Sequence, residues 1–140
     1  MKKTRVLVTG IGGGGHGEQI LKALKAAEIP LEIVGADMTR ISRGLSEVET
    51  SFLLPPANDP EYIDTLLQKC KEYDIEVMFH GSEPELKIMS ENRERIRDSG
   101  VFLPINSREV INNCMDKFKT VEFLREHGFN YPTTYHITSI

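Results

Sequence analysis

The chain has 140 residues, a length typical of one domain with a hydrophobic core of its own. Its composition is that of a soluble globular protein, with 39% hydrophobic residues, 27% charged residues and a formal net charge of −4. That charge, together with the lack of any dense basic run, argues against nucleic acid and anionic membranes as partners.

The first predicted element is a buried parallel strand over residues 5–9, which leads into a glycine-dense turn and a helix over residues 18–27. Glycine permits positive φ and close approach of a ligand, and the helix directs free N–H groups into the turn. The turn fits G-x-G-x-x-G twice, which is typical of the first βα unit of a Rossmann-like fold. As candidate anion- or substrate-binding residues we take Gly12, Gly13, Gly14, Gly15 and His16. The alternative is that a tight turn needs glycine without any ligand and that His16 is simply exposed.

The following elements alternate between strand and helix. We predict strands over 31–36, 51–54, 76–80 and 101–103, and helices within 42–48, from 60 to 73 after an Asp59 cap, over 83–98, from 107 and over 116–127. This alternation predicts an α/β fold, a Rossmann-like three-layer domain with a mainly parallel sheet of about five strands. The first strand is expected at its centre, with helices on both faces. We place the domain in residues 1–115 and a helix and linker in residues 116–140.

Ligands of such sheets bind beyond the carboxyl ends of the strands, where the glycine turn, Asp37 and the segment that contains Ser82 and Glu83 are expected to meet. Asp37 either holds a ribose hydroxyl, as a Rossmann acid does, or is a solvated loop acid that caps the turn that follows it. Glu83 either stabilises a helix dipole or receives a cationic or amine-bearing substrate. Glu85 is two positions further on and does not share a helix face with Glu83, so we assign no catalytic carboxylate pair and no catalytic residue.

Cys70 and Cys114 are far apart and lack C-x-x-C spacing, which indicates reduced thiols in a cytoplasmic protein. The four histidines have no spacing typical of a metal cluster, so no metal site is predicted. The apolar stretches are too short to span a bilayer, and the N-terminal residues do not have the pattern of a signal peptide.

Four segments, in their order, resemble the N-terminal region of ATP-grasp ligases over essentially the whole chain. The likeness is greatest to the large chain of carbamoyl-phosphate synthase and related carboxylate–amine ligases. It rests on the glycine turn, on Gly35-Ala36-Asp37, on Glu83-Pro84-Glu85-Leu86, and on a C-terminal pattern made of Asp116-Lys117, Phe123-Leu124-Arg125-Glu126-His127-Gly128-Phe129 and Pro132-Thr133-Thr134.

The resemblance implies a pre-ATP-grasp domain, a Rossmann-like module that precedes the ATP-binding lobes. The edge with the glycine turn, Asp37 and Glu83 would form the acceptor-substrate side of the cleft, and Lys117 would face the ATP phosphates. The parent enzyme would use ATP and Mg²⁺ to form an acyl-phosphate that an amine or thiol attacks. The chain shows neither a lid nor a metal-holding cluster, so we expect a fragment of a larger ligase, inactive alone and without a cofactor of its own.

The expected partners are a small-molecule carboxylate or amine substrate, the ATP-grasp domain and a second copy of the chain. The last follows from the helix over 116–127, whose Phe118, Val121, Phe123 and Leu124 lie on more than one side. We expect the segment after Lys117 to be loosely ordered or buried in a homodimer. The alternative function is a self-contained NAD(P)- or nucleotide-binding Rossmann module, which would not need the C-terminal pattern.

Overall fold

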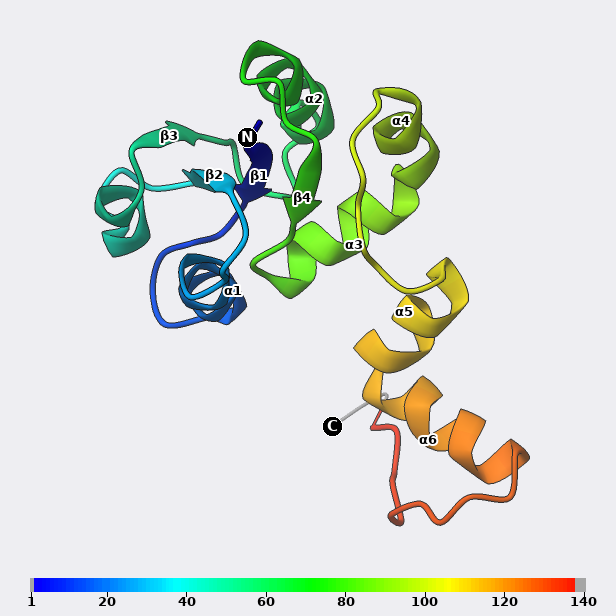
Figure 1. The fold of residues 1–140 in the computed structure, drawn as a ribbon. Helices are drawn as coiled ribbons and strands as arrows, with labels where there is room; N and C mark the ends of the chain where they lie inside the picture. The colour runs from blue at the N-terminus through cyan, green and yellow to red at the C-terminus, as the bar shows by residue number, and fades with distance from the viewer. Residues whose placement is uncertain (1, 138–140) are drawn as a thin grey trace. The chain divides into compact units, whose positions relative to one another are not determined.

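The computed structural model of the chain describes residues 2–137, which divide into two compact units after Ile105. The first unit is built on a parallel sheet with the strand order β3-β2-β1-β4 (Figure 1). Its strands are β1 (Thr4–Val8), β2 (Leu31–Asp37), β3 (Thr50–Leu53) and β4 (Val77–Phe79). The expected α/β class, parallel sheet and central first strand are confirmed.

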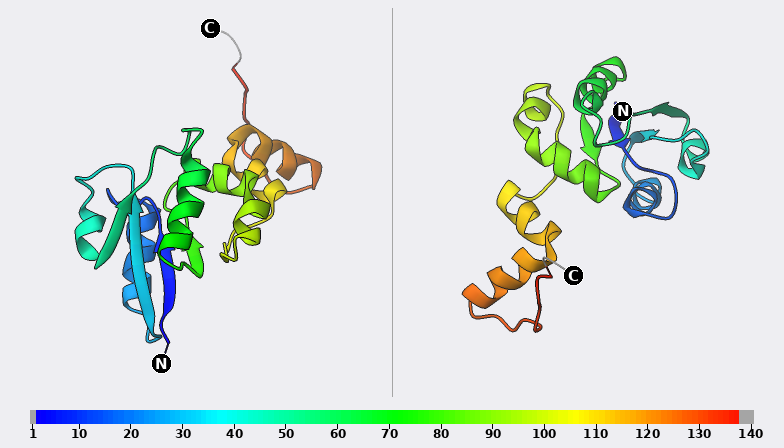
Figure 2. Two further views of the ribbon diagram at one scale, coloured as in Figure 1. Left: turned by 90° about the horizontal axis from the view of Figure 1, so that it is seen from above. Right: turned by 180° about the vertical axis from the view of Figure 1, so that it is seen from behind.

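Strand β1 is apolar because both of its faces are covered. Val6, Leu7 and Val8 are at most 2% exposed, and Val8 lies in register with Gly35 of β2 and Phe79 of β4. Helix α1 (His16–Lys25) lies on one face of the sheet and α2 (Tyr62–Glu72) on the other, as the views in Figure 2 confirm. The sheet therefore has the covered, three-layer arrangement that its continuous apolar strands predict.

The expected fifth strand is reduced to a single parallel bridge between Val77 and Phe102. Phe102 donates its N–H to Glu76 and accepts one from Met78. Pro104 follows two residues later and has no N–H to continue the ladder. Within the described residues the sheet therefore has four strands, and the segment from Val101 forms an irregular edge.

The helix expected over 83–98 is interrupted. Helix α3 (Glu83–Glu91) and α4 (Arg93–Asp98) are separated by Asn92, which has φ −110° and ψ 20°. The Ile88 carbonyl accepts from both the Asn92 side chain at 2.9 Å and the Asn92 backbone N–H at 3.1 Å, so Asn92 closes the last turn of α3. Met89 and Ile96, one from each piece, are fully buried in the main core with Tyr62.

The second unit contains α5 (Arg108–Met115) and α6 (Lys117–Glu126). Ser107 Oγ accepts from the Val110 N–H, and the Asp116 carboxylate accepts from Phe118 and Lys119, so both helices begin at side-chain caps. The structure thus groups the helix after Ser107 with the second unit, whereas the sequence placed the boundary after residue 115. Among the described residues of these two helices, Ile111 of α5 is buried, and α6 has no buried residue.

No helix within residues 2–137 combines the length and the apolar character needed to cross a membrane.

Candidate functional site

The carboxyl ends of all four strands open into one cavity of about 960 Å³ in the first unit. Each strand supplies one wall: the glycine turn after β1, residues 38–43 after β2, residues 54–58 after β3 and residues 81–85 after β4. The position is the one where open parallel α/β sheets bind ligands, and the volume suits a small molecule.

The glycine turn needs glycine for two separate reasons. Gly13 and Gly14 have φ values of +86° and +77°, a conformation that L side chains rarely adopt. Gly12 is crowded instead: a Cβ there would lie 2.0 Å from Ser42 Oγ and 2.9 Å from Asp37 Oδ2. The glycine density thus allows the turn to pass directly beside the segment that follows β2.

We expect Gly12→Ala to lower the free energy of unfolding by about 1–3 kcal/mol, the usual cost of overpacking a filled site. Rotation of the Ser42 hydroxyl cannot relieve the clash, because Ser42 Cβ would also be only 2.7 Å from the new methyl group. Urea unfolding followed by circular dichroism measures this cost. Gly15→Ala is the matched control, since the atom nearest to its new methyl group would be Gly81 O at 3.8 Å, and it should cost less than about 1 kcal/mol. Equal costs for the two variants would contradict the crowding at Gly12.

Asp37 ends β2 and is 7% exposed. Its Oδ2 accepts from the Gly12 N–H at 2.8 Å, and its Oδ1 accepts from the Thr39 N–H at 3.1 Å. The carboxylate therefore connects the glycine turn to the segment after β2. Its bond to the Thr39 N–H caps the turn that follows β2. Each oxygen keeps acceptor capacity on the side of the cavity.

Glu85 is the second buried carboxylate of the cavity, 8% exposed. Oε1 accepts from the Tyr62 hydroxyl at 3.0 Å, and Oε2 accepts from Ser82 Oγ at 2.9 Å and from the Gly81 N–H at 3.3 Å. Ser82 is the N-cap of α3 and accepts in turn from the Glu85 N–H. Ser82 and Glu85 have the S-x-x-E spacing of a capping box, and this spacing could have identified Glu85 rather than Glu83 from the sequence.

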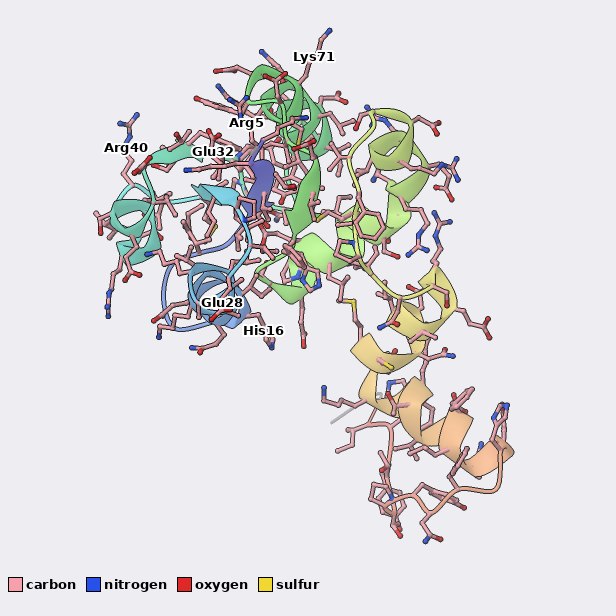
Figure 3. The ribbon with its side chains drawn as sticks, viewed as in Figure 1. Arg5, His16, Glu28, Glu32, Arg40 and Lys71 are labelled. Atoms are coloured by element: carbon pink, nitrogen blue, oxygen red, sulfur yellow. The ribbon has the colours of Figure 1, made fainter. Side chains whose placement is uncertain are left out.

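The structure separates the predicted site residues into two groups. Gly12, Gly13, Gly15, Asp37 and Ser82 line the cavity. Gly14, His16 and Glu83 are exposed and are not among its lining residues, and Lys117 is an exposed residue of the second unit. Figure 3 shows His16, the first residue of α1, with its side chain directed outward.

One wall of the cavity and one hydroxyl that lines it were not predicted from the sequence. Leu54 to Asn58 form an apolar wall after β3, for which the Pro55-Pro56 pair at a strand end was the available signal. Ser42 also lines the cavity and is 8% exposed. Nothing in the local sequence distinguishes that serine from others in loops.

His80 follows β4 and is half-buried behind the Gly81 turn. Burial lowers the pKa of the His80 imidazole, and the negative charge of Glu85 opposes this shift only in part. In the unfolded chain the ring takes up its proton near its ordinary pKa of about 6.5. Between that value and the lower folded pKa, the unfolded state binds more protons than the folded state.

The stability of the protein should therefore fall as the pH drops from about 7.5 to about 5, and His80 should contribute part of that slope. The measurement is urea unfolding at several pH values for the wild type and for His80→Asn, which has no titrating ring. We expect a shallower pH dependence in the variant. Parallel curves would show that His80 titrates alike in both states.

Residues 6–104 match the model of the PylC-like N-terminal domain. The chain belongs to this family. The match includes the central strand from Val6 onward, the other three strands and every wall of the cavity. The PylC-like N-terminal domain thus accounts for the unit that carries the site, and helices α5 and α6 lie beyond it.

Three solved structures share the fold of this PylC-like domain. The biotin carboxylase domain of a thermophilic 2-oxoglutarate carboxylase, bound to bicarbonate, is 14% identical with a TM-score of 0.62, and the match covers 90% of this chain and 28% of that one. Pyruvate carboxylase from Rhizobium etli is 12% identical with a TM-score of 0.65, and the match covers 96% of this chain and 13% of that one. N5-carboxyaminoimidazole synthetase from Staphylococcus aureus, complexed with ADP, is 16% identical with a TM-score of 0.57, and the match covers 91% of this chain and 31% of that one.

At these identities the likeness establishes the fold, and the expected Rossmann-like pre-ATP-grasp domain is confirmed. The chain spans less than a third of each of these proteins, at most 31%. A comparison with curated protein sequences finds no match.

Proposed function

We propose that this chain forms the acceptor-substrate side of an ATP-dependent carboxylate–amine or carboxylate–thiol ligase, of the carbamoyl-phosphate synthase-like type. The observation that supports this most is the cavity at the carboxyl edge of a PylC-like N-terminal domain, because a pocket at this position suits a small-molecule substrate. Gly12, Gly13, Gly15, Asp37 and Ser82, which line this cavity, contribute the binding surface.

ATP belongs to the parent enzyme in this proposal, and Lys117 faces its phosphates once the ATP-grasp lobes are present. A lysine is a compact charge suited to phosphate. Two of the proteins with this fold support a nucleotide in the parent: the S. aureus synthetase was solved with ADP, and the Hydrogenobacter thermophilus 2-oxoglutarate carboxylase domain was solved with MgADP.

Magnesium does not fit the residues that the structure describes in this chain. Among residues 2–137, no group of three or more His, Cys, Asp or Glu side chains is arranged to hold a metal ion. In phosphoryl transfer, magnesium is held by one or two protein carboxylates together with the oxygens of the phosphates. We therefore assign the metal to the ATP-grasp lobes and derive no step of the reaction from this chain, which should be inactive by itself.

The proposal is tested by ADP formation. The purified 140-residue chain should release no ADP from MgATP above the blank in the presence of mixed carboxylates and amines, and Lys117→Ala should not alter this. In a protein that joins this domain to its ATP-grasp lobes, Lys117→Ala should weaken MgATP binding or slow ADP release, while Lys119→Ala, two residues along α6, should have little effect. Turnover by the isolated chain that Lys117→Ala abolishes would overturn the proposed division of labour.

The alternative, a self-contained NAD(P)-binding module, predicts micromolar affinity for NAD(P) in calorimetry. A dinucleotide pyrophosphate needs the N–H groups of the glycine turn. The Gly12 N–H is already donated to Asp37, so the hydrogen bonds of the turn favour the ligase proposal.

A further inference from the structure

The His80 ring lies where a fully protonated imidazole has an unsatisfied donor. His80 directly follows β4 and precedes the cavity wall of residues 81–85, and it is half-buried. Its Nδ1 atom is buried and makes no hydrogen bond to any residue that the structure describes. Both ring nitrogens of an imidazolium are donors. Because a buried donor without an acceptor is unfavourable, protonation of this ring must be accompanied by a change in its surroundings.

Two charged side chains, from two different helices, act on this ring. Burial is the largest influence and lowers the pKa of the His80 imidazole. The charge of Glu85 in α3 favours the protonated ring, as does a hydrogen bond to the Ser82 backbone, whereas the charge of His16 in α1 opposes it. Glu85 is therefore the carboxylate toward which a protonated His80 is attracted.

Glu85 is at the same time the acceptor that holds the turn after His80. Its Oε1 accepts from the Tyr62 hydroxyl at 3.0 Å, and its Oε2 accepts from Ser82 Oγ at 2.9 Å and from the Gly81 N–H at 3.3 Å. The bond from Gly81 is the longest of the three, and Gly81 is the neighbour of His80 in the chain. Because an imidazolium attracts a carboxylate more strongly than an amide dipole does, this bond is the first to be lost when His80 is protonated.

The packing of Gly81 determines what happens to the wall once that bond is lost. Gly81 is buried, and a Cβ placed on it would lie 2.0 Å from the Thr9 carbonyl oxygen and 2.7 Å from that of Gly10. Its backbone is thus packed directly against the end of the first strand and the start of the glycine turn. A displacement of Gly81 can only lead away from these carbonyls, and it moves the wall of residues 81–85 with it.

We propose that His80 is a pH-sensitive switch of the cavity: its protonated ring competes with the Gly81 N–H for Glu85, and the wall of residues 81–85 then opens. In the open state the ring is solvated and has its ordinary pKa of about 6.5, whereas in the closed state burial lowers that pKa. The open state therefore binds more protons, and its population rises as the pH falls below about 6.5. The switch rests on the proposed function only for the statement that the cavity receives a substrate.

The test is amide hydrogen exchange of the whole chain, labelled with ¹⁵N, from about pH 8 to about pH 5, the range in which histidine titrates. The rates are corrected for the intrinsic pH dependence of exchange. We expect the protection of the Gly81 amide to fall with the protonation of the His80 ring, by up to about tenfold for each unit that separates the pKa values of the ring in the open and closed states. The Leu7 amide in the central strand should keep its protection, which distinguishes local opening from global unfolding.

Two variants remove the two parts of the switch. His80→Asn has no titrating ring, so the corrected protection of Gly81 should no longer depend on pH. Glu85→Gln removes the attracting charge, so the ring should titrate at lower pH and the pH response of Gly81 should be greatly reduced. Should Glu85→Gln not fold, His80→Asn still decides the matter. His127→Asn is the matched control, because His127 is an exposed histidine of the second unit, and its Gly81 response should equal that of the wild type.

Three outcomes would overturn the switch: a Gly81 protection that does not change while His80 titrates, an unchanged response of Gly81 in His80→Asn, or an equal loss of protection at Leu7 and Gly81. The last outcome would mean that acid unfolds the whole unit. The measurement requires neither ATP nor a substrate. Its failure would therefore leave the ligase proposal standing on the Lys117 experiment, and failure of that experiment would leave a domain whose cavity wall opens in acid.

Discussion

Val8→Asp should abolish stable folding of the first unit. Val8 is fully buried in the central strand, between Gly35 of β2 and Phe79 of β4. An unpaired carboxylate at that position costs several kcal/mol or is forced to bind a proton. Because domains of this size are stable by only about 5–15 kcal/mol, the loss should appear as greatly reduced helical ellipticity at 25 °C or as a large drop in the urea midpoint.

The matched control introduces the same residue on the edge of the same sheet. Ser51 is exposed in β3, the strand at one end of the order, and Ser51→Asp should alter the unfolding free energy by no more than about 0.5 kcal/mol. A Val8→Asp variant as stable as Ser51→Asp would show that β1 is not the covered central strand.

The second large effect is expected at Glu85. Glu85→Ala should destabilise the protein by about 3–5 kcal/mol, because it leaves the buried donors Tyr62 OH and Gly81 N–H, and the half-buried Ser82 OH, without their shared acceptor. Burial raises the pKa of the Tyr62 phenol, with the charge of Glu85 adding to the shift, so the hydroxyl remains a donor. Denaturant unfolding followed by near- and far-ultraviolet circular dichroism measures the loss.

Two variants separate the Glu85 network from the general effect of an acid at a helix start. Tyr62→Phe should cost about 1–2 kcal/mol, and its effect should largely vanish in the Glu85→Ala background, since the partner is then already gone. Glu83→Gln removes an exposed acid from the same helical turn and should cost less than about 1 kcal/mol. Additive costs for Tyr62 and Glu85 would mean that their hydrogen bond is not formed.

Most of the architecture could be predicted from local sequence. Buried runs such as Val6 to Val8 form parallel strands because they are apolar on both faces, and the glycines after them admit a turn that other residues cannot adopt. Asp116 and Ser107 mark helix starts through caps that act within a few residues. The position of the cavity followed from the general rule for strand ends in parallel sheets.

The errors arose where a local pattern was valid but the backbone geometry or hydrogen bonding at one residue interrupted the element. The segment from Val101 is apolar enough for a strand, yet Pro104 removes the donor that the ladder needs. The charged segment after Glu83 has helical periodicity throughout, yet the backbone leaves helical geometry at Asn92, whose side chain bonds to the Ile88 carbonyl. The break at Asn92 depends on side-chain and backbone geometry that residue types alone do not specify, whereas the missing N–H of Pro104 is visible in the sequence.

The sequence by itself determined the class of the domain, its central strand, its glycine turn and the edge at which the turn, Asp37 and the segment after β4 meet. Only the tertiary structure decided that Glu85 rather than Glu83 is buried at that edge and that Ser42 lies beside Gly12 without a partner. The reason is physical. Strand burial and turn conformation depend on neighbouring residues, whereas the pairing of a carboxylate or hydroxyl depends on which distant donors the packed chain brings within about 3 Å of it.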